Sequence, residues 1–200
     1  MAFLRMSEAR AAAGGRAYNL RAAEQALAEQ ARAFSPSKRY DVFLSHSYQD
    51  ADVILGVKAI IESLGLTVYV DWVDDGGLDR SKVTVKTAEI LRVRMRQSSS
   101  MVYVHSAQSP DSKWMPWELG YFDGFRSAVA ILPIAQTTEE SFAGQEYLGL
   151  YSYIDGSGAM LWVNRGSAPE RLFHGTTGYK QFGEWRGLVI WCEMTEKWLV

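Results

Sequence analysis

The sequence contains a single cysteine, Cys192, so a disulfide framework within the chain is impossible. One thiol fits a reducing compartment, and we expect a cytoplasmic location. No apolar run approaches the roughly 18 residues that a membrane span needs, and the first residues lack the apolar core of a secretory signal. We therefore expect no association with a membrane.

Neither sign of charge dominates, since 21 Lys and Arg residues stand against 23 Asp and Glu residues. This balance gives no general attraction to nucleic acid, which we do not expect as a partner. Hydrophobic residues make up 48% of the chain and charged residues 22%, which excludes a mainly disordered protein. The length of 200 residues suits one domain with an appendage.

Several ligand-binding motifs are missing as well. The chain has neither a G-x-x-x-x-G-K-[ST] loop nor a G-x-G-x-x-G turn, which argues against nucleotide binding of the P-loop or Rossmann type. His105 and His174 have no His, Cys or Asp neighbours at the spacing of metal ligands. We therefore expect no metal site and no bound cofactor.

The composition of the chain changes near Ser35-Pro36-Ser37. Alanine and basic residues are frequent before this point, and Val, Ile, aromatic and acidic residues become frequent after it. We expect an Ala-rich helical arm and linker over 1–37, a domain over 38–165 and an unassigned extension over 166–200. Asn19 is suited to cap a helix that runs to Phe34, either as a solvated arm or as a short docking helix.

Predicted strands and helices alternate from Tyr40 onward. Strands are predicted at 40–45, 67–70, 100–104, 129–133 and 147–153, with a further apolar piece at 160–163, and helices at 50–64, 83–97 and 117–125. Strands separated by helices of these lengths form βαβ units, so we expect an α/β fold with about five parallel strands and helices on both faces. Ligands of such sheets bind outside the carboxyl ends of the strands.

A carboxylate among aromatic residues follows the third of these strands. Glu118 is predicted on the first turn of a helix, flanked by Trp114, Trp117 and Tyr121. Aromatic walls exclude water, so the negative charge would act in a low dielectric, which suits cleavage at a sugar C1′ through a positively charged transition state. An alternative interpretation is purely structural. In it, Glu118 interacts favourably with the helix dipole, and the Trp residues pack between the helix and the sheet.

Two other segments carry polar side chains. Ser45-His46-Ser47 ends the first strand, where it either contacts a polar ligand or forms a turn with Ser47 or Asp50 as helix cap. The helix at 83–97 is predicted to have an inner and an outer face. The inner face holds Val85, Ala88, Leu91 and Met95, and the outer face holds Lys82, Lys86, Arg92, Arg94 and Arg96. We expect this basic face to be solvated, with a partner's acidic surface as the alternative. Nucleic acid is the weakest alternative, because no aromatic residues interleave with the charges.

The ordered set of these segments resembles the Toll/interleukin-1 receptor (TIR) domain family. The strand 40–46, the acidic Gly-containing loop 71–79 and the segment 113–119 are similar to the family's first strand, its BB loop and the W-x-x-x-E-L pattern of its enzymatic members. Asp50 and Gly65 fit the same order. The resemblance covers about 38–165 and implies a flavodoxin-like fold.

The resemblance also implies an activity. Many bacterial TIR proteins cleave NAD at the nicotinamide–ribose bond, with NAD as substrate rather than cofactor. Carried over by position, Glu118 would be the catalytic carboxylate. The residues expected to bind the substrate are Ser45 and His46 on the pocket floor, Asp71 and Trp72 at the mouth of the BB loop, and Trp114 and Tyr121 as aromatic walls.

The chain is similar to the signal-producing TIR subunit of Thoeris anti-phage systems. That similarity implies a product derived from ADP-ribose, possibly cyclic in form, a separate effector that senses it, and self-association between TIR domains. Two alternatives stay open. One is a non-enzymatic TIR scaffold that assembles through its basic helix face and acidic BB loop. The other is a nucleoside 2-deoxyribosyltransferase, whose nucleophile segment resembles 117–121.

Overall fold

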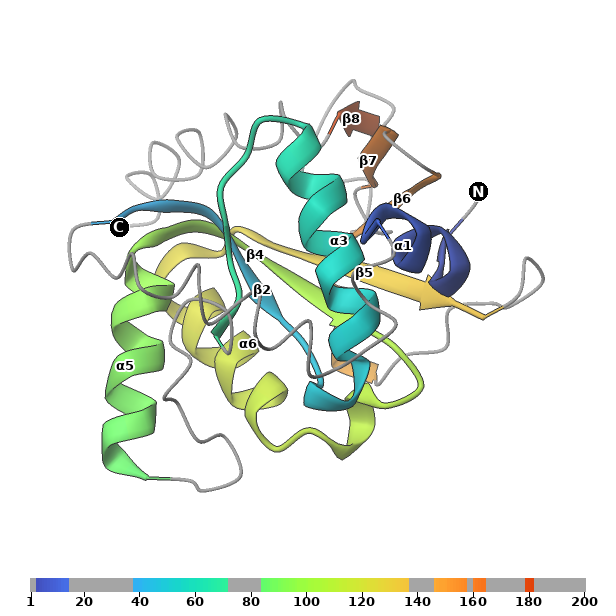
Figure 1. Cartoon of the computed structure of the whole chain (residues 1–200). Coiled ribbons are helices and arrows are strands. Elements are labelled where there is room, and N and C mark those ends of the chain that lie inside the picture. The colour runs from blue at the N-terminus through green and yellow to red at the C-terminus, as the bar shows by residue number, and fades with distance from the viewer. Residues whose placement is uncertain are drawn as a thin grey trace.

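The computed structural model describes residues 3–14, 38–71, 84–136, 146–157, 160–164 and 179–181. Within these residues, eight strands form one sheet with helices on both faces (Figure 1). The strands are β1 (Leu4–Arg5), β2 (Tyr40–Ser45), β3 (Val68–Tyr69), β4 (Ser98–His105), β5 (Val129–Ala135), β6 (Ser152–Ser157), β7 (Met160–Asn164) and β8 (Tyr179–Gln181). The helices are α1 (Met6–Ala12), α3 (Ala51–Ser63), α5 (Val85–Arg96) and α6 (Trp114–Arg126).

The sheet has the strand order β3-β2-β4-β5-β6-β7-β8. The five strands from β3 to β6 run parallel, and β7 and β8 continue the sheet in antiparallel pairs. This order confirms the predicted flavodoxin-like sheet of five parallel strands. The fifth strand begins later than expected, because the start of the predicted strand at 147–153 forms the short 3₁₀ helix η4 (Glu146–Leu150).

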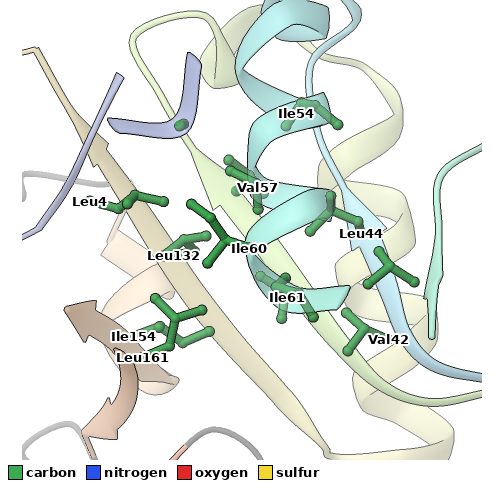
Figure 2. Packing of buried hydrophobic residues seen from close by; sticks show 14 of the residues in the cluster. Leu4, Val42, Leu44, Ile54, Val57, Ile60, Ile61, Leu132, Ile154 and Leu161 are labelled. Atoms are coloured by element: carbon green, nitrogen blue, oxygen red, sulfur yellow. The ribbon is translucent and has the colours of Figure 1, made fainter. Parts of the chain in front are cut away.

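Alternate residues of the central strands build two separate cores. Val42 and Leu44 of β2 face α3, and Phe43 between them faces α5 and α6. Figure 2 shows the first core, in which Ile60 and Ile61 of α3 pack against the sheet. Both faces of the parallel strands are therefore covered, as their near-continuous apolar sequences require.

The predicted inner face of α5 is correct at Leu91 and Met95 but wrong at two other positions. Val85, expected inside, is 75% exposed, and Arg94, expected on the solvated face, is only 2% exposed. The guanidinium of Arg94 lies over the Tyr69 ring and donates to the side-chain oxygen of Gln97. A long side chain can bury its aliphatic part while its charged end finds partners, which a simple polar–apolar pattern does not anticipate.

The first described residues belong to the domain core. β1 pairs in parallel with Ile134 and Ala135, in the half of β5 that β6 leaves unpaired. Leu4 and Ala9 are fully buried, and Arg10 of α1 forms an ion pair with Asp52 of α3. Residues 3–14 are thus not an appended arm, because Leu4 and Ala9 belong to the same hydrophobic core as the sheet and α3.

Other predicted features lie outside the described residues. These are the helix expected at 19–34 and the extension at 166–200, of which the structure describes only β8. The proposed domain boundary near residue 37 stays a prediction. In the described part of the chain, no helix has both the length and the apolar character needed to cross a membrane.

Candidate active site

Helix α6 begins three residues earlier than predicted. It starts at Trp114, with Lys113 at the cap and Pro116 as its third residue. Proline is compatible with this position because the first N–H groups of a helix have no partner within it. Glu118 therefore lies in the second turn rather than the first, so the partial positive charge at the helix start acts on it from farther away.

The side chain of Glu118 meets the end of β2. The Ser45 hydroxyl donates a hydrogen bond of 2.6 Å to Glu118 Oε2, although the two residues are 73 positions apart. Both residues are 0% exposed. A short bond from a hydroxyl to a carboxylate is among the stronger hydrogen bonds in proteins, and it fixes the position of the carboxylate at the carboxyl end of the sheet.

A second polar pair lies beside the first. The Nδ1–H of His46 donates to the Leu44 carbonyl at 2.9 Å, and its Nε2 lies 3.5 Å from Asp71 Oδ1. Both side chains are buried. Asp71 lies two residues after the end of β3, so the pair connects the carboxyl ends of β2 and β3.

The aromatic residues around Glu118 have different surroundings. Trp114 lies one helical turn before Glu118 and is buried, in edge-to-face contact with Trp117 at 5.5 Å. Tyr121 stacks on Trp117 at 5.8 Å and faces two arginines of α5, Arg92 and Arg96. The described contacts of Tyr121 thus point toward α5. Trp72 lies outside the described residues.

Tyr103 of β4 is a residue near Glu118 that the sequence analysis missed. It is buried, and burial is the main cause that raises the pKa of its phenol, with smaller contributions from Tyr147 and from the Glu118 carboxylate. The phenol therefore stays protonated at neutral pH and can donate a hydrogen bond. The alternation along β4 would have placed Tyr103 on the face that carries α6.

A buried network anchors the loop that leads from β4 to α6. The Ser106 hydroxyl donates to Asp50 Oδ2 at 2.6 Å and accepts the N–H of Gln108 at 3.0 Å. The Ser109 hydroxyl accepts the N–H of Ser106 and donates to the Val104 carbonyl. Ser47 and Asp50 lie at N-cap positions, of the 3₁₀ helix η2 (Tyr48–Asp50) and of α3, but neither side chain forms a capping hydrogen bond. Asp50 instead fixes the loop before Trp114.

Burial raises the pKa of Asp50 above its ordinary value, although the Ser106 hydrogen bond opposes this shift. Because the folded-state pKa is the higher one, the contribution of Asp50 to stability is most favourable below its unfolded pKa of about 4 and decreases as the pH rises through the folded pKa. Asp50→Asn stays neutral and can still accept from Ser106. We expect its free energy of unfolding, relative to wild type, to increase between pH 4 and pH 7.

Urea denaturation at both pH values measures this difference. Asp111→Asn provides the control, because Asp111 is an exposed carboxyl in the same loop region. If the free energy of unfolding of Asp50→Asn, relative to wild type, decreased over the same pH range, that result would contradict the role of burial at Asp50.

In the described residues, no cluster of three or more His, Cys, Asp or Glu side chains is arranged to hold a metal ion. The arrangement instead offers a fixed buried carboxylate, a hydroxyl, an imidazole–carboxylate pair and aromatic surfaces at the carboxyl edge of a parallel sheet. A fixed carboxylate in a water-poor site can stabilise a developing positive charge.

Comparison with known proteins gives two relatives, and no family model matches the chain. The chain is 52% identical over 134 residues to the "Probable 3' cyclic ADP-D-ribose synthase ThsB'" of Bacillus cereus (strain MSX-D12), an alignment that covers 66% of this chain and 69% of the relative. It is 39% identical over 85 residues to the "Putative cyclic ADP-D-ribose synthase TIR2" of Cytobacillus dafuensis. That second alignment covers 42% of this chain and 22% of the relative.

Proposed function

The chain belongs to the family of bacterial TIR proteins that includes Thoeris-type cyclic ADP-ribose synthases, and from this premise we propose that it converts NAD into nicotinamide and a cyclic ADP-ribose. The observation that carries the proposal is the buried hydrogen bond between Ser45 and Glu118. With the family established, the nucleoside 2-deoxyribosyltransferase alternative is set aside.

The first step breaks the bond between ribose C1′ and the nicotinamide nitrogen. The bonding electron pair stays with the nitrogen, which is cationic in NAD, so nicotinamide leaves as a neutral molecule without a general acid. The ribose is left as an oxocarbenium ion. In this proposal, the Glu118 carboxylate stabilises that cation, and the Ser45 hydroxyl holds the carboxylate in one position.

The second step forms a new bond to C1′ from a nucleophile of the same molecule, either a ring nitrogen of adenine or a ribose hydroxyl. One proton is released overall, so NAD gives nicotinamide, the cyclic product and H⁺. Exclusion of water supports cyclisation over hydrolysis, since both Ser45 and Glu118 are inaccessible to solvent. The same burial means that NAD reaches Glu118 only after the surrounding residues rearrange.

An isotope experiment tests the proposed outcome. The purified chain is incubated with NAD in water enriched in ¹⁸O, and the products are separated and weighed by mass spectrometry. Cyclisation gives a product without ¹⁸O that is one water lighter than ADP-ribose. Hydrolysis gives ADP-ribose with one ¹⁸O atom, and this result as the main product would contradict the proposal.

Removing the Ser45 hydroxyl is expected to slow the reaction. Ser45→Ala leaves the Glu118 carboxylate buried without this donor, and a hydrogen bond to a charged group contributes about 1.5–3 kcal/mol, so we expect kcat to fall about 10- to 150-fold. Nicotinamide release under saturating NAD measures the change. Ser63→Ala on α3, which also loses a hydroxyl donor, serves as the control. Equal rates for Ser45→Ala and the control would contradict the role of Ser45.

Partners other than NAD remain part of the proposal. We place the protein in the cytoplasm, with a separate effector that responds to the cyclic product and with contacts between TIR domains that assemble the enzyme. The scaffold alternative rested on the basic face of the helix at 83–97, which was predicted to include Arg94, and on the acidic BB loop opposite to it. Because Arg94 is buried, this basic face is smaller than predicted. The burial of Arg94 therefore weakens the scaffold alternative relative to the enzyme.

A further inference from the structure

An open groove of about 520 Å³ lies between α5 and the second half of α6. Its lining residues are Arg96, Gly120, Tyr121, Gly124, Phe125 and Arg126. A Cβ placed on either glycine would meet no atom within 4 Å, so the space above this side of α6 is unfilled by the protein. A volume of this size falls within the range of small-molecule sites, about 300–1,000 Å³.

Positive charge gathers around the groove. Arg92 and Arg96 extend from α5 and Arg126 from α6, and none of the three forms an ion pair within the described part of the chain. The carboxylates of α6 are engaged elsewhere, Glu118 with Ser45 and Asp123 with Tyr151. The Nε of Arg126 is buried and has no hydrogen-bond partner among the described residues. The groove therefore favours an anionic ligand.

Aromatic rings lie directly beside these charges. Trp117, Tyr121 and Phe125 recur every four residues along α6 and form one continuous stripe. The guanidinium of Arg92 lies 5.4 Å from the Trp117 ring, and Phe125 is 41% exposed. Charged and aromatic side chains that are separate in sequence are thus interleaved in space, although α5 itself contains no aromatic residue.

Compensation of the helix dipoles is the simpler explanation for two of these arginines, because Arg96 and Arg126 lie in the last turns of α5 and α6. That explanation does not account for Arg92, which lies before the last turn. It also does not account for the open space over the glycines or for an aromatic stripe left partly exposed.

We propose that the groove between α5 and α6 binds a mononucleotide, with the base stacked on the aromatic stripe and the phosphates paired with Arg96 and Arg126. Flat π surfaces and planar guanidinium groups are the side chains that recognise these two halves of a nucleotide. The site is separate from the candidate active site, because Glu118 faces β2 and lies eight residues, or about 12 Å of helix, before Arg126.

Binding of ATP to the full chain, measured by isothermal titration calorimetry, tests the proposal. We expect one ATP to bind at this groove and Arg96→Gln/Arg126→Gln to weaken it by at least about tenfold. Phe125→Ala is expected to weaken ATP binding by about tenfold while leaving the affinity for tripolyphosphate unchanged. Lys86→Gln, which removes one positive charge at an exposed position of α5, is expected to have no effect.

Glu118→Gln separates this groove from the site proposed for NAD, and we expect it to leave ATP binding unchanged. Circular dichroism of each variant establishes that the fold is retained. Four results would overturn the proposal. The first three are no ATP binding up to about 1 mM, unchanged affinity in the double arginine variant, and loss of ATP binding in Glu118→Gln. Tripolyphosphate that binds as tightly as ATP would also overturn it, since the base would then play no part.

Discussion

Glu118→Gln is expected to lower nicotinamide release from NAD by at least about 10²-fold while the protein stays folded. The substitution keeps the size of the side chain and leaves an oxygen that can accept the Ser45 hydrogen bond, but it removes the negative charge. Since the proposed role of Glu118 is to stabilise a cation, the loss should appear in kcat, and the thermal midpoint should change little.

Glu89→Gln is the matched control for this prediction. Glu89 is an exposed carboxylate on α5, so its neutralisation changes the net charge equally without touching the site. Nicotinamide release by Glu118→Gln at the rate of Glu89→Gln would exclude Glu118 as the catalytic carboxylate.

Gly56→Ala is expected to release α1 and β1 from the domain. A Cβ at position 56 of α3 would lie 1.6 Å from the carbonyl oxygen of Ala9, a backbone atom that cannot move without displacing α1. Loss of this docking exposes Leu4 and Ala9 and breaks the pairing of β1 with β5. We expect a destabilisation of about 2–4 kcal/mol, limited to the stabilisation that the docked segment supplies.

Gly124→Ala on α6 makes the same chemical change where a Cβ meets no atom within 4 Å. Alanine is the better helix former, so this control is expected to stabilise the protein by about 0.5–1 kcal/mol. Urea denaturation measures the free energy of unfolding of both variants. In Gly56→Ala, hydrogen exchange is expected to show a loss of amide protection at residues 3–14. If the two substitutions changed the free energy of unfolding by the same amount and in the same direction, that result would contradict close packing of α1 on α3.

The central sheet could be predicted because the hydrophobic pattern that specifies each strand or helix lies within that segment of the sequence. Apolar runs of strand length alternate with helical periodicity along 40–135, and the rule that parallel sheets bind ligands at their carboxyl ends brought Ser45, His46 and Glu118 to one edge. The bond between Ser45 and Glu118 could not be predicted, because it depends on how far α6 is rotated and where it starts. The start was missed because the helix was predicted to begin at Trp117, directly after Pro116, whereas Pro116 is its third residue.

The remaining errors have a common cause in tertiary contacts. The segment 3–14 has few apolar residues, and nothing local indicates that Leu4 completes the edge of β5. Arg94 and Asp50 are polar residues whose burial depends on partners distant in the fold, the Tyr69 ring for one and the Ser106 hydroxyl for the other. Patterns of hydrophobicity predict the average inward face of an element and not such individual exceptions.

The most direct test of the central claim is a crystal structure of Glu118→Gln with NAD bound, since this variant should hold the substrate without cleaving it. The proposal predicts C1′ of the nicotinamide ribose at about 3.5 Å from the side chain of residue 118, next to Ser45, with the nicotinamide ring against Trp114. NAD bound with its nicotinamide ribose far from residue 118, for example in the groove between α5 and α6, would contradict it.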